Sequence, residues 1–216
     1  MEKRDLLEKM KRSIVDGLQD EAENLAKEAV KEQMDLNKVI DEGFVPGIQE
    51  VGVLWEKGEY FLPELITSAE CMKAAIAVLE PELKKAQIQK KSHGTVVIGT
   101  VEGDIHDIGK NLVASMLSAN GFEVLDLGAD VKLEQFIDKA EQENADFICL
   151  SALLTTTMLG QRKLIAMLKE KGLSDKFKVL VGGAPVTQKW ADDIGADGYA
   201  ENAMTAVKLA KDIVKS

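Results

Sequence analysis

The sequence predicts an all-α domain followed by an α/β domain with a flavodoxin-like, five-stranded parallel sheet. Residues 1–90 carry apolar side chains at helical spacing, whereas from Thr95 onward short β-rich runs alternate with helical stretches. Between these halves, residues 84–92 are polar and charged, which is typical of a linker. We therefore expect a helical domain at 1–90 and an α/β domain at 93–216.

Four helices are expected in the first domain. The first ends near Gly17, and the second covers residues 20–34. The third covers residues 36–57, and its pattern is interrupted by Gly43, Pro46 and Gly47. The fourth begins at Pro63, because proline suits a first helical position, where no N–H is needed. Short connections between amphipathic helices favour a four-helix bundle.

Five strand–helix units are expected in the second domain. The predicted strands are 95–100, 122–127, 146–151, 177–182 and 197–200. The predicted helices are 107–120, 132–144, 157–171, 187–193 and 202–215. This alternation predicts a parallel sheet covered on both faces, and five units suit the strand order 2-1-3-4-5.

Composition narrows the possible functions. A net charge of −10 disfavours nucleic acid and anionic membrane surfaces as partners. No apolar run reaches the roughly 18–20 residues of a membrane span, and the charged segment Met1 to Asp5 lacks a signal-peptide core. Cys71 and Cys149 have no metal-binding spacing, so we expect buried free thiols in a cytoplasmic protein.

Chemically useful residues gather where the predicted strands end. The loop after the first strand contains Asp104 and His106, and the segments after the third and fourth contain residues 151–157 and the pair Gly182-Gly183. Ligands of doubly wound sheets bind outside the carboxyl ends of the strands. A histidine there is well placed to ligate a metal, and an acid two residues away can hold the ring through its other nitrogen.

A phosphate-binding loop is not expected at this place. Five residues separate Gly103 from Gly109, whereas a P-loop has four between its glycines. Asn111 follows Lys110, where a P-loop has serine or threonine, and the Rossmann glycine fingerprint is absent.

Three motifs together resemble the signature of base-off, histidine-on cobalamin-binding domains. They are Asp104-x-His106-x-x-Gly109, Ser151-x-Leu153 and Gly182-Gly183, in that order along the chain. The helical half, from Val51 through Trp55 and Leu65 to Ala69, resembles the cap domain of cobalamin-dependent methyltransferases such as methionine synthase. The whole chain is thus similar to the corrinoid proteins of methanol, methylamine and methoxyaromatic methyltransferase systems.

The resemblance implies roles for individual residues. His106 would be the lower axial ligand to the cobalt of a cobalamin or related corrinoid, Asp104 would hold its other ring nitrogen, and Thr157 would complete this catalytic relay with a hydroxyl that relatives supply from serine. The other expected cofactor contacts are Ile105, Gly109, Ser151, Leu153, Thr155, Gly182, Gly183 and Ala203. Trp55, Leu62 and Leu65 would shield the upper, methyl-bearing face.

The residues alone leave simpler interpretations open. Asp104 is also placed to cap the helix that follows it. The segment Thr155 to Thr157 could likewise be the capped start of the next helix. Trp55, Leu62 and Leu65 lie at a spacing that bundle core alone would explain.

The resemblance implies a methyl carrier. Cobalt(I) would accept a methyl group with the help of a substrate-specific methyltransferase, and methyl-cobalt(III) would pass it to a thiol or folate acceptor through a second methyltransferase. A reductive activator would be a further partner. The chain shows no barrel or zinc–thiolate site for either reaction, so it is expected to be a subunit rather than a complete enzyme. The alternatives are the small subunit of an adenosylcobalamin mutase and a non-enzymatic B12 sensor.

Overall fold

The computed structural model describes residues 3–85 and 92–215, which form two compact units, Met1–Lys91 and Ser92–Ser216. The predicted linker covers residues 84–92. Its first two residues are the end of a helix, and residues 86–91 lie outside the described part of the chain, which resumes at Ser92.

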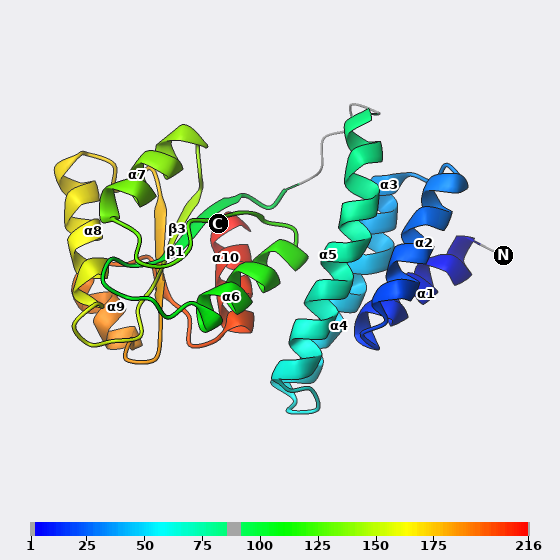
Figure 1. Ribbon diagram of the computed structural model, residues 1–216, viewed down its shortest axis with the longest axis horizontal. Coiled ribbons are helices and arrows are strands. Elements are labelled where there is room, and N and C mark those ends of the chain that lie inside the picture. The colour runs from blue at the N-terminus through cyan, green and yellow to red at the C-terminus, as the bar shows by residue number, and fades with distance from the viewer. Residues whose placement is uncertain (1–2, 86–91, 216) are drawn as a thin grey trace. The chain divides into compact units, whose positions relative to one another are not determined.

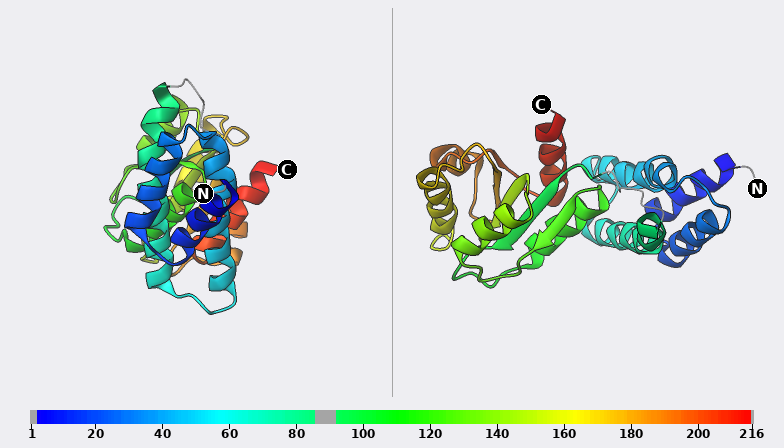
Figure 2. Two further views of the ribbon diagram at one scale, coloured as in Figure 1. Left: turned by 90° about the vertical axis from the view of Figure 1, so that its right-hand side faces the viewer. Right: turned by 90° about the horizontal axis from the view of Figure 1, so that it is seen from above.

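The first unit is helical, as predicted (Figure 1). Its elements are α1 (Lys3–Val15), α2 (Gln19–Lys31), α3 (Leu36–Lys38), the π-helical η1 (Val39–Phe44), α4 (Val45–Glu56) and α5 (Leu62–Lys85). Helix α2 packs against α5 and α1 against α4, and the helices lie side by side in Figure 2. Their apolar faces form a common core that includes Met10, Leu25, Phe44, Ile48 and Leu79.

The interruption expected within residues 36–57 is a change of helix type rather than a break. The chain runs from α3 through η1 into α4 without leaving the helical conformation. A Cβ added at Gly43 would lie 2.9 Å from the sulfur of Met10, and one at Gly47 would lie 2.6 Å from the carbonyl oxygen of Lys11. These glycines therefore let α1 pack closely against this stretch, which explains why they do not end the helix.

The second unit is a parallel sheet between two helical layers. Its strands are β1 (Thr95–Thr100), β2 (Glu123–Asp126), β3 (Phe147–Ser151), β4 (Lys178–Gly182) and β5 (Gly198–Tyr199). Its helices are α6 (Ile108–Ala119), α7 (Leu133–Gln142), α8 (Leu159–Glu170), α9 (Gln188–Ile194) and α10 (Ala203–Lys215). The strand order is β2-β1-β3-β4-β5, which confirms the predicted fold class, and the element bounds differ from the predicted ones by at most two residues.

The two helical layers bury both faces of the sheet. Helices α6 and α10 pack together on one side, while α7, α8 and α9 form the other layer (Figures 1 and 2). The central strands are consequently apolar along most of their length, as is usual for parallel sheets. Val97, Phe136, Ile148, Leu164 and Val181 belong to the core under the second layer.

The two cysteines are free and buried, as predicted. Burial raises the pKa of Cys149 to about 12 and that of Cys71 to about 11, so both thiols stay protonated near neutral pH. None of the helices in the described parts of the chain has the length and apolar character needed to cross a membrane.

Candidate functional site

The carboxyl ends of the three central strands lie in register. Thr100 of β1 pairs with Ser151 of β3, which in turn pairs with Gly182 of β4. Ser151 and Gly182 are themselves motif residues, and Asp104 lies in the loop that follows Thr100, so the sheet brings the three motifs to one edge. The strand order changes direction between β1 and β3, which is where doubly wound folds bind their ligands.

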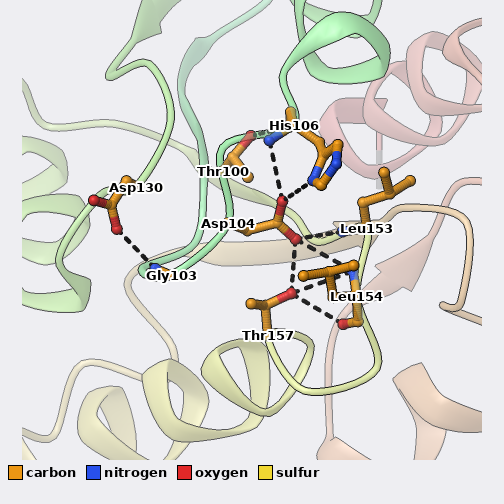
Figure 3. A network of polar contacts seen from close by, with 8 residues as sticks. All are labelled: Thr100, Gly103, Asp104, His106, Asp130, Leu153, Leu154 and Thr157. Atoms are coloured by element: carbon orange, nitrogen blue, oxygen red, sulfur yellow. Dashed lines mark hydrogen bonds and ion pairs between the residues drawn. The ribbon is translucent and has the colours of Figure 1, made fainter.

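Asp104 is the centre of a hydrogen-bond network at this edge (Figure 3). Its Oδ1 accepts from the backbone N–H of His106 (3.1 Å) and lies 2.7 Å from His106 Nδ1. Its Oδ2 accepts from the hydroxyl of Thr157 (2.7 Å) and from the backbone N–H groups of Leu153 (2.7 Å) and Leu154 (3.3 Å). The structure thus brings Thr157, 53 positions further along the chain, into one chain of contacts with Asp104 and His106.

This network keeps a fully buried carboxylate ionised. Asp104 is 0% exposed, and burial by itself would raise its pKa. The hydrogen bonds from Thr157, His106 and the N–H of Leu153 outweigh that effect and hold the pKa of Asp104 well below its usual range. Asp104 is therefore an acceptor on both oxygens.

The state of Asp104 determines the tautomer of His106. Because an ionised carboxylate only accepts hydrogen bonds, the proton of a neutral imidazole must lie on Nδ1, and Nε2 keeps its lone pair. The backbone of His106 is held as well, since its carbonyl accepts from the buried hydroxyl of Thr100 at 3.0 Å. The His106 side chain is 48% exposed. The arrangement therefore presents the lone pair of Nε2, on a ring held in one orientation, to a group that binds at this edge.

The glycines of the motifs differ in why they are needed. Gly183 has φ +125°, and a Cβ there would lie 1.8 Å from the carbonyl oxygen of Ala152, so the fold itself requires glycine. At Gly182 the nearest atom, the carbonyl oxygen of Ala200, would be 3.2 Å away. At Gly109 an added Cβ would meet nothing within 4 Å. The packing of the described residues therefore gives no reason for glycine at position 109.

Exposed apolar side chains gather in the two segments that meet at Asp104. Among the described residues of the second unit, all but one of the exposed large hydrophobic side chains come from these segments. They are Ile105, Ile108, Leu153, Leu154 and Leu159. Exposed apolar groups concentrated around one polar group are typical of a binding surface for an apolar ligand.

The remaining predicted site residues lie as follows. Ser151 is half-buried at the end of β3, Thr155 is exposed in the next segment, and Ala203 is buried at the start of α10. In the helical unit Trp55 is half-buried and Leu62 is 44% exposed, whereas Leu65 is only 1% exposed and lies inside the bundle.

Some contributors to this site were not predicted from the sequence. Thr100 and Asp130 hold the backbone of the loop that carries Asp104, and the only signal for Thr100 was a hydroxyl in an otherwise apolar strand.

Lys110, which a P-loop would offer to phosphate, is 2% exposed and paired with Asp126 at 2.5 Å. It ties α6 to the end of β2.

His106 is an isolated candidate ligand. Within residues 3–85 and 92–215 no group of three or more His, Cys, Asp or Glu side chains is arranged to hold a metal ion. A donor set of one imidazole fits a metal that arrives with its other ligands, as in a macrocycle.

Known proteins resemble the chain over nearly its whole length. A family model described as a B12 binding domain matches residues 94–208, and a second model with the same description matches residues 6–80. A corrinoid protein of Desulfitobacterium hafniense is 52% identical, with 97% of each chain covered. Dimethylamine corrinoid protein 2 of Methanosarcina acetivorans is 48% identical, with coverage of 98% of this chain and 97% of its own.

Two solved structures of cobalamin-related proteins are also similar to the chain in fold. The methanol:cobalamin methyltransferase complex MtaBC from Methanosarcina barkeri contains a chain with a TM-score of 0.88 and 32% identity, covering 99% of this chain and 81% of its own. A cobalamin-binding protein from Desulfitobacterium hafniense DCB-2 matches with a TM-score of 0.78 and 33% identity, covering 95% and 97%. The motifs, the fold and these relatives together identify the chain as a member of the corrinoid protein family, with a B12 binding domain at its carboxyl-terminal end.

Proposed function

We propose that this protein carries a methyl group on a corrinoid whose cobalt takes His106 as its lower axial ligand. One observation carries the proposal. The buried carboxylate of Asp104 fixes the proton of His106 on Nδ1, which leaves Nε2 as a donor among exposed apolar side chains. A flat, largely apolar macrocycle with an open axial position matches both features.

The residues present fit such a cofactor. Ile105 and Leu153 would contact the macrocycle, and Gly109, where a side chain has room but none is present, would let it approach the backbone. The cofactor's tail would run along residues that lie at or after the ends of β3, β4 and β5, namely Ser151, Thr155, Gly182, Gly183 and Ala203. Trp55 and Leu62 of a cap at residues 1–90 would shield the upper face of a cofactor bound to residues 93–216, whereas Leu65, at 1% exposed, packs inside the bundle.

When bound, the corrinoid supplies a cobalt centre that accepts and gives up a methyl group, and the chain's own residues control the lower side. Asp104 keeps the Nδ1 proton in place while Nε2 is a ligand. The carboxylate of Asp104 would hold the ring through the same contact when Nε2 is not a ligand. Thr157 helps to keep that carboxylate ionised.

Two methyltransferases and a reductive activator are the proposed partners. One methyltransferase would deliver the methyl group from its substrate, and the other would transfer it to a thiol or folate. The relatives' names support this, because they are corrinoid proteins for dimethylamine and trimethylamine, and one related structure is a methyltransferase complex. The protein would work in the cytoplasm, where free thiols such as Cys71 and Cys149 persist.

A methyl-transfer assay tests the proposal. The full chain would be loaded with cobalamin, reduced, and mixed with a methylamine or methanol methyltransferase and its isotope-labelled substrate. We expect label to become bound to the protein's corrinoid, and to leave it when a methyltransferase with a thiol acceptor is added. Corrinoid-loaded protein that stays unlabelled with methanol, monomethylamine, dimethylamine and trimethylamine systems would contradict the role as carrier for these donors.

A further inference from the structure

Asp130 makes two hydrogen bonds to the loop that carries Asp104, and Figure 3 shows the one to Gly103. The backbone N–H of Gly103 donates to Asp130 Oδ1 at 2.7 Å, and the backbone N–H of Asp130 donates to the carbonyl oxygen of Asp104 at 2.9 Å. We propose that Asp130 is a positioning residue that fixes the Asp104 loop and, through it, the orientation and tautomer of His106. The significance of this role for cobalt ligation rests on the function proposed above.

The contact joins two loops that the sequence keeps apart. Asp130 follows β2, whereas Gly103 and Asp104 follow β1, and Gly103 and Asp130 are 27 positions apart in the sequence. Just beside it, Val101 and Val131 form an isolated parallel bridge. The loop after β2 therefore continues the edge of the sheet and holds the loop that carries the site.

Asp130 has an unusual backbone conformation, which its side-chain hydrogen bond accounts for. Its φ is +54°, in the left-handed region that residues other than glycine rarely adopt. Only Gln33 and Asn144 share this property among the non-glycine residues that the structure describes. Glycine would adopt the same conformation more easily, but only a side-chain oxygen can accept from Gly103. The strain is thus explained by the hydrogen bond that the side chain makes.

Asp130 would act on His106 through Asp104. A single oxygen of Asp104, Oδ1, contacts both the backbone nitrogen and Nδ1 of His106, so a small rotation of Asp104 weakens both contacts. The N–H of Asp104 also donates to the carbonyl oxygen of Val101 at 3.1 Å, which restrains the peptide between Gly103 and Asp104. Asp130 restrains the peptides on either side of that one, through the N–H of Gly103 and the carbonyl oxygen of Asp104.

The test compares three variants of the full chain. Asp130→Gly removes the acceptor and relieves the backbone strain, so a lost contact is not confused with a strained fold. Asp130→Asn keeps an oxygen acceptor in a residue that tolerates this conformation. Asn144→Gly is the matched control, because it relieves the same strain in the loop between α7 and β3, at the other end of the sheet.

Nitrogen NMR of the corrinoid-free protein gives the first readout. The chain has two histidines, so His106 is distinguished from His93 by one substitution. In wild type and in Asn144→Gly we expect His106 as a single tautomer with its proton on Nδ1. In Asp130→Gly we expect loss of the single-tautomer pattern, and in Asp130→Asn its recovery. A wild-type pattern in Asp130→Gly, or an equal loss in Asn144→Gly, would overturn the proposal.

Electron paramagnetic resonance of cobalamin-loaded, cobalt(II) protein gives the second readout. Nitrogen splitting reports how many molecules have His106 bound to cobalt, and we expect this fraction to fall in Asp130→Gly and to recover in Asp130→Asn. An unchanged fraction would contradict the effect on ligation. Failure of every form, wild type included, to bind cobalamin would instead contradict the proposed function, and the NMR result would still decide the role of Asp130.

Discussion

At the scale of single residues, the site depends on one buried charge. Asp104 is completely enclosed, yet five donors from His106, Leu153, Leu154 and Thr157 meet its two oxygens. A buried carboxylate with so many partners is stable only if the surrounding loops keep their conformation. The same bonds that stabilise the charge therefore hold His106 in place.

This charge makes stability depend on pH. Burial alone would raise the pKa of Asp104, but its hydrogen bonds, above all that from Thr157, hold the pKa below its usual range. The unfolded chain therefore binds the proton more readily, and the stabilisation is present above the ordinary aspartate pKa of about 3.9 and is lost as the pH falls below it.

We expect the free energy of unfolding of the wild type to fall more steeply than that of Asp104→Asn between about pH 5 and about pH 3, because only the wild type loses this charge. Urea denaturation of both proteins across this range measures the difference. Parallel curves would mean that Asp104 does not have a lowered pKa in the folded protein.

Two glycines of the motifs should respond oppositely to the same substitution. Gly183→Ala should lower the free energy of unfolding by at least about 2 kcal/mol, because its Cβ would collide with the backbone of Ala152. Gly109→Ala should leave stability unchanged or raise it by up to about 1 kcal/mol, because its Cβ meets open space and α6 favours alanine. Its cobalamin affinity should nevertheless fall about tenfold, or about 1.4 kcal/mol.

Denaturation and cobalamin titration of both variants check this. Tight cobalamin binding by Gly109→Ala would show that the macrocycle does not approach position 109.

Sequence patterns predicted the motif residues but not the contacts that hold them. Asp104 and His106 were found because they are adjacent in a motif and lie on a strand-end loop. Asp130 and the N–H groups of Leu153 and Leu154 were not found, because backbone donors carry no sequence signal. The purpose of Gly183 likewise depends on how closely β4 approaches the segment after β3, a distance that no local pattern contains.

At the scale of elements, the three central strands were predicted well because their burial makes them largely apolar. The helical stretch of residues 36–57 was predicted less well, since glycine and proline were taken to interrupt it. The structure uses Gly43 and Gly47 for close packing against α1, and Pro46 lies in the first turn of α4, where it is tolerated. The same residue types break a helix or fit one depending on what packs beside them.

The ends of β3 and β4 are joined by one side chain of α8. Gln161 is fully buried, and its Nε2 donates to the carbonyl oxygens of Leu150 and Gly182 at 3.1 Å each. Its Oε1 accepts from the indole N–H of Trp190 at 3.0 Å. Every polar atom of this amide is satisfied, so Gln161 connects the two strand ends that precede the serine and glycine motifs.

Gln161→Leu should therefore lower the free energy of unfolding by about 1–3 kcal/mol, because it leaves buried polar groups without partners while nearly keeping the side chain's volume. Gln135→Leu, on the exposed side of α7, is the control and should change stability by less than about 0.5 kcal/mol. Urea denaturation compares them. Equal effects would show that the amide of Gln161 contributes nothing specific.

At the scale of the whole molecule, the hydrogen-bond network around His106 lies within one unit. Asp104, His106, Asp130 and Thr157 all lie within Ser92–Ser216, and the described contacts of the network do not involve the helical unit.

Residues 92–216 expressed alone should fold and bind cobalamin with histidine coordination, because the sheet, its core and the whole network lie in this segment. Circular dichroism and the absorbance of bound cobalamin test this. A fragment that folds but lacks histidine coordination would show that the helical unit is needed for the lower ligand.

The most direct test of the central claim is a titration of the full chain with hydroxocobalamin. We expect wild type to bind about one equivalent with the absorbance of base-off, histidine-on coordination. His93→Ala, which removes the chain's other histidine, should give the same spectrum. His106→Ala should lose the signature even where cofactor is retained. A wild type that binds no corrinoid, or a His106→Ala protein with an unchanged spectrum, would contradict the account.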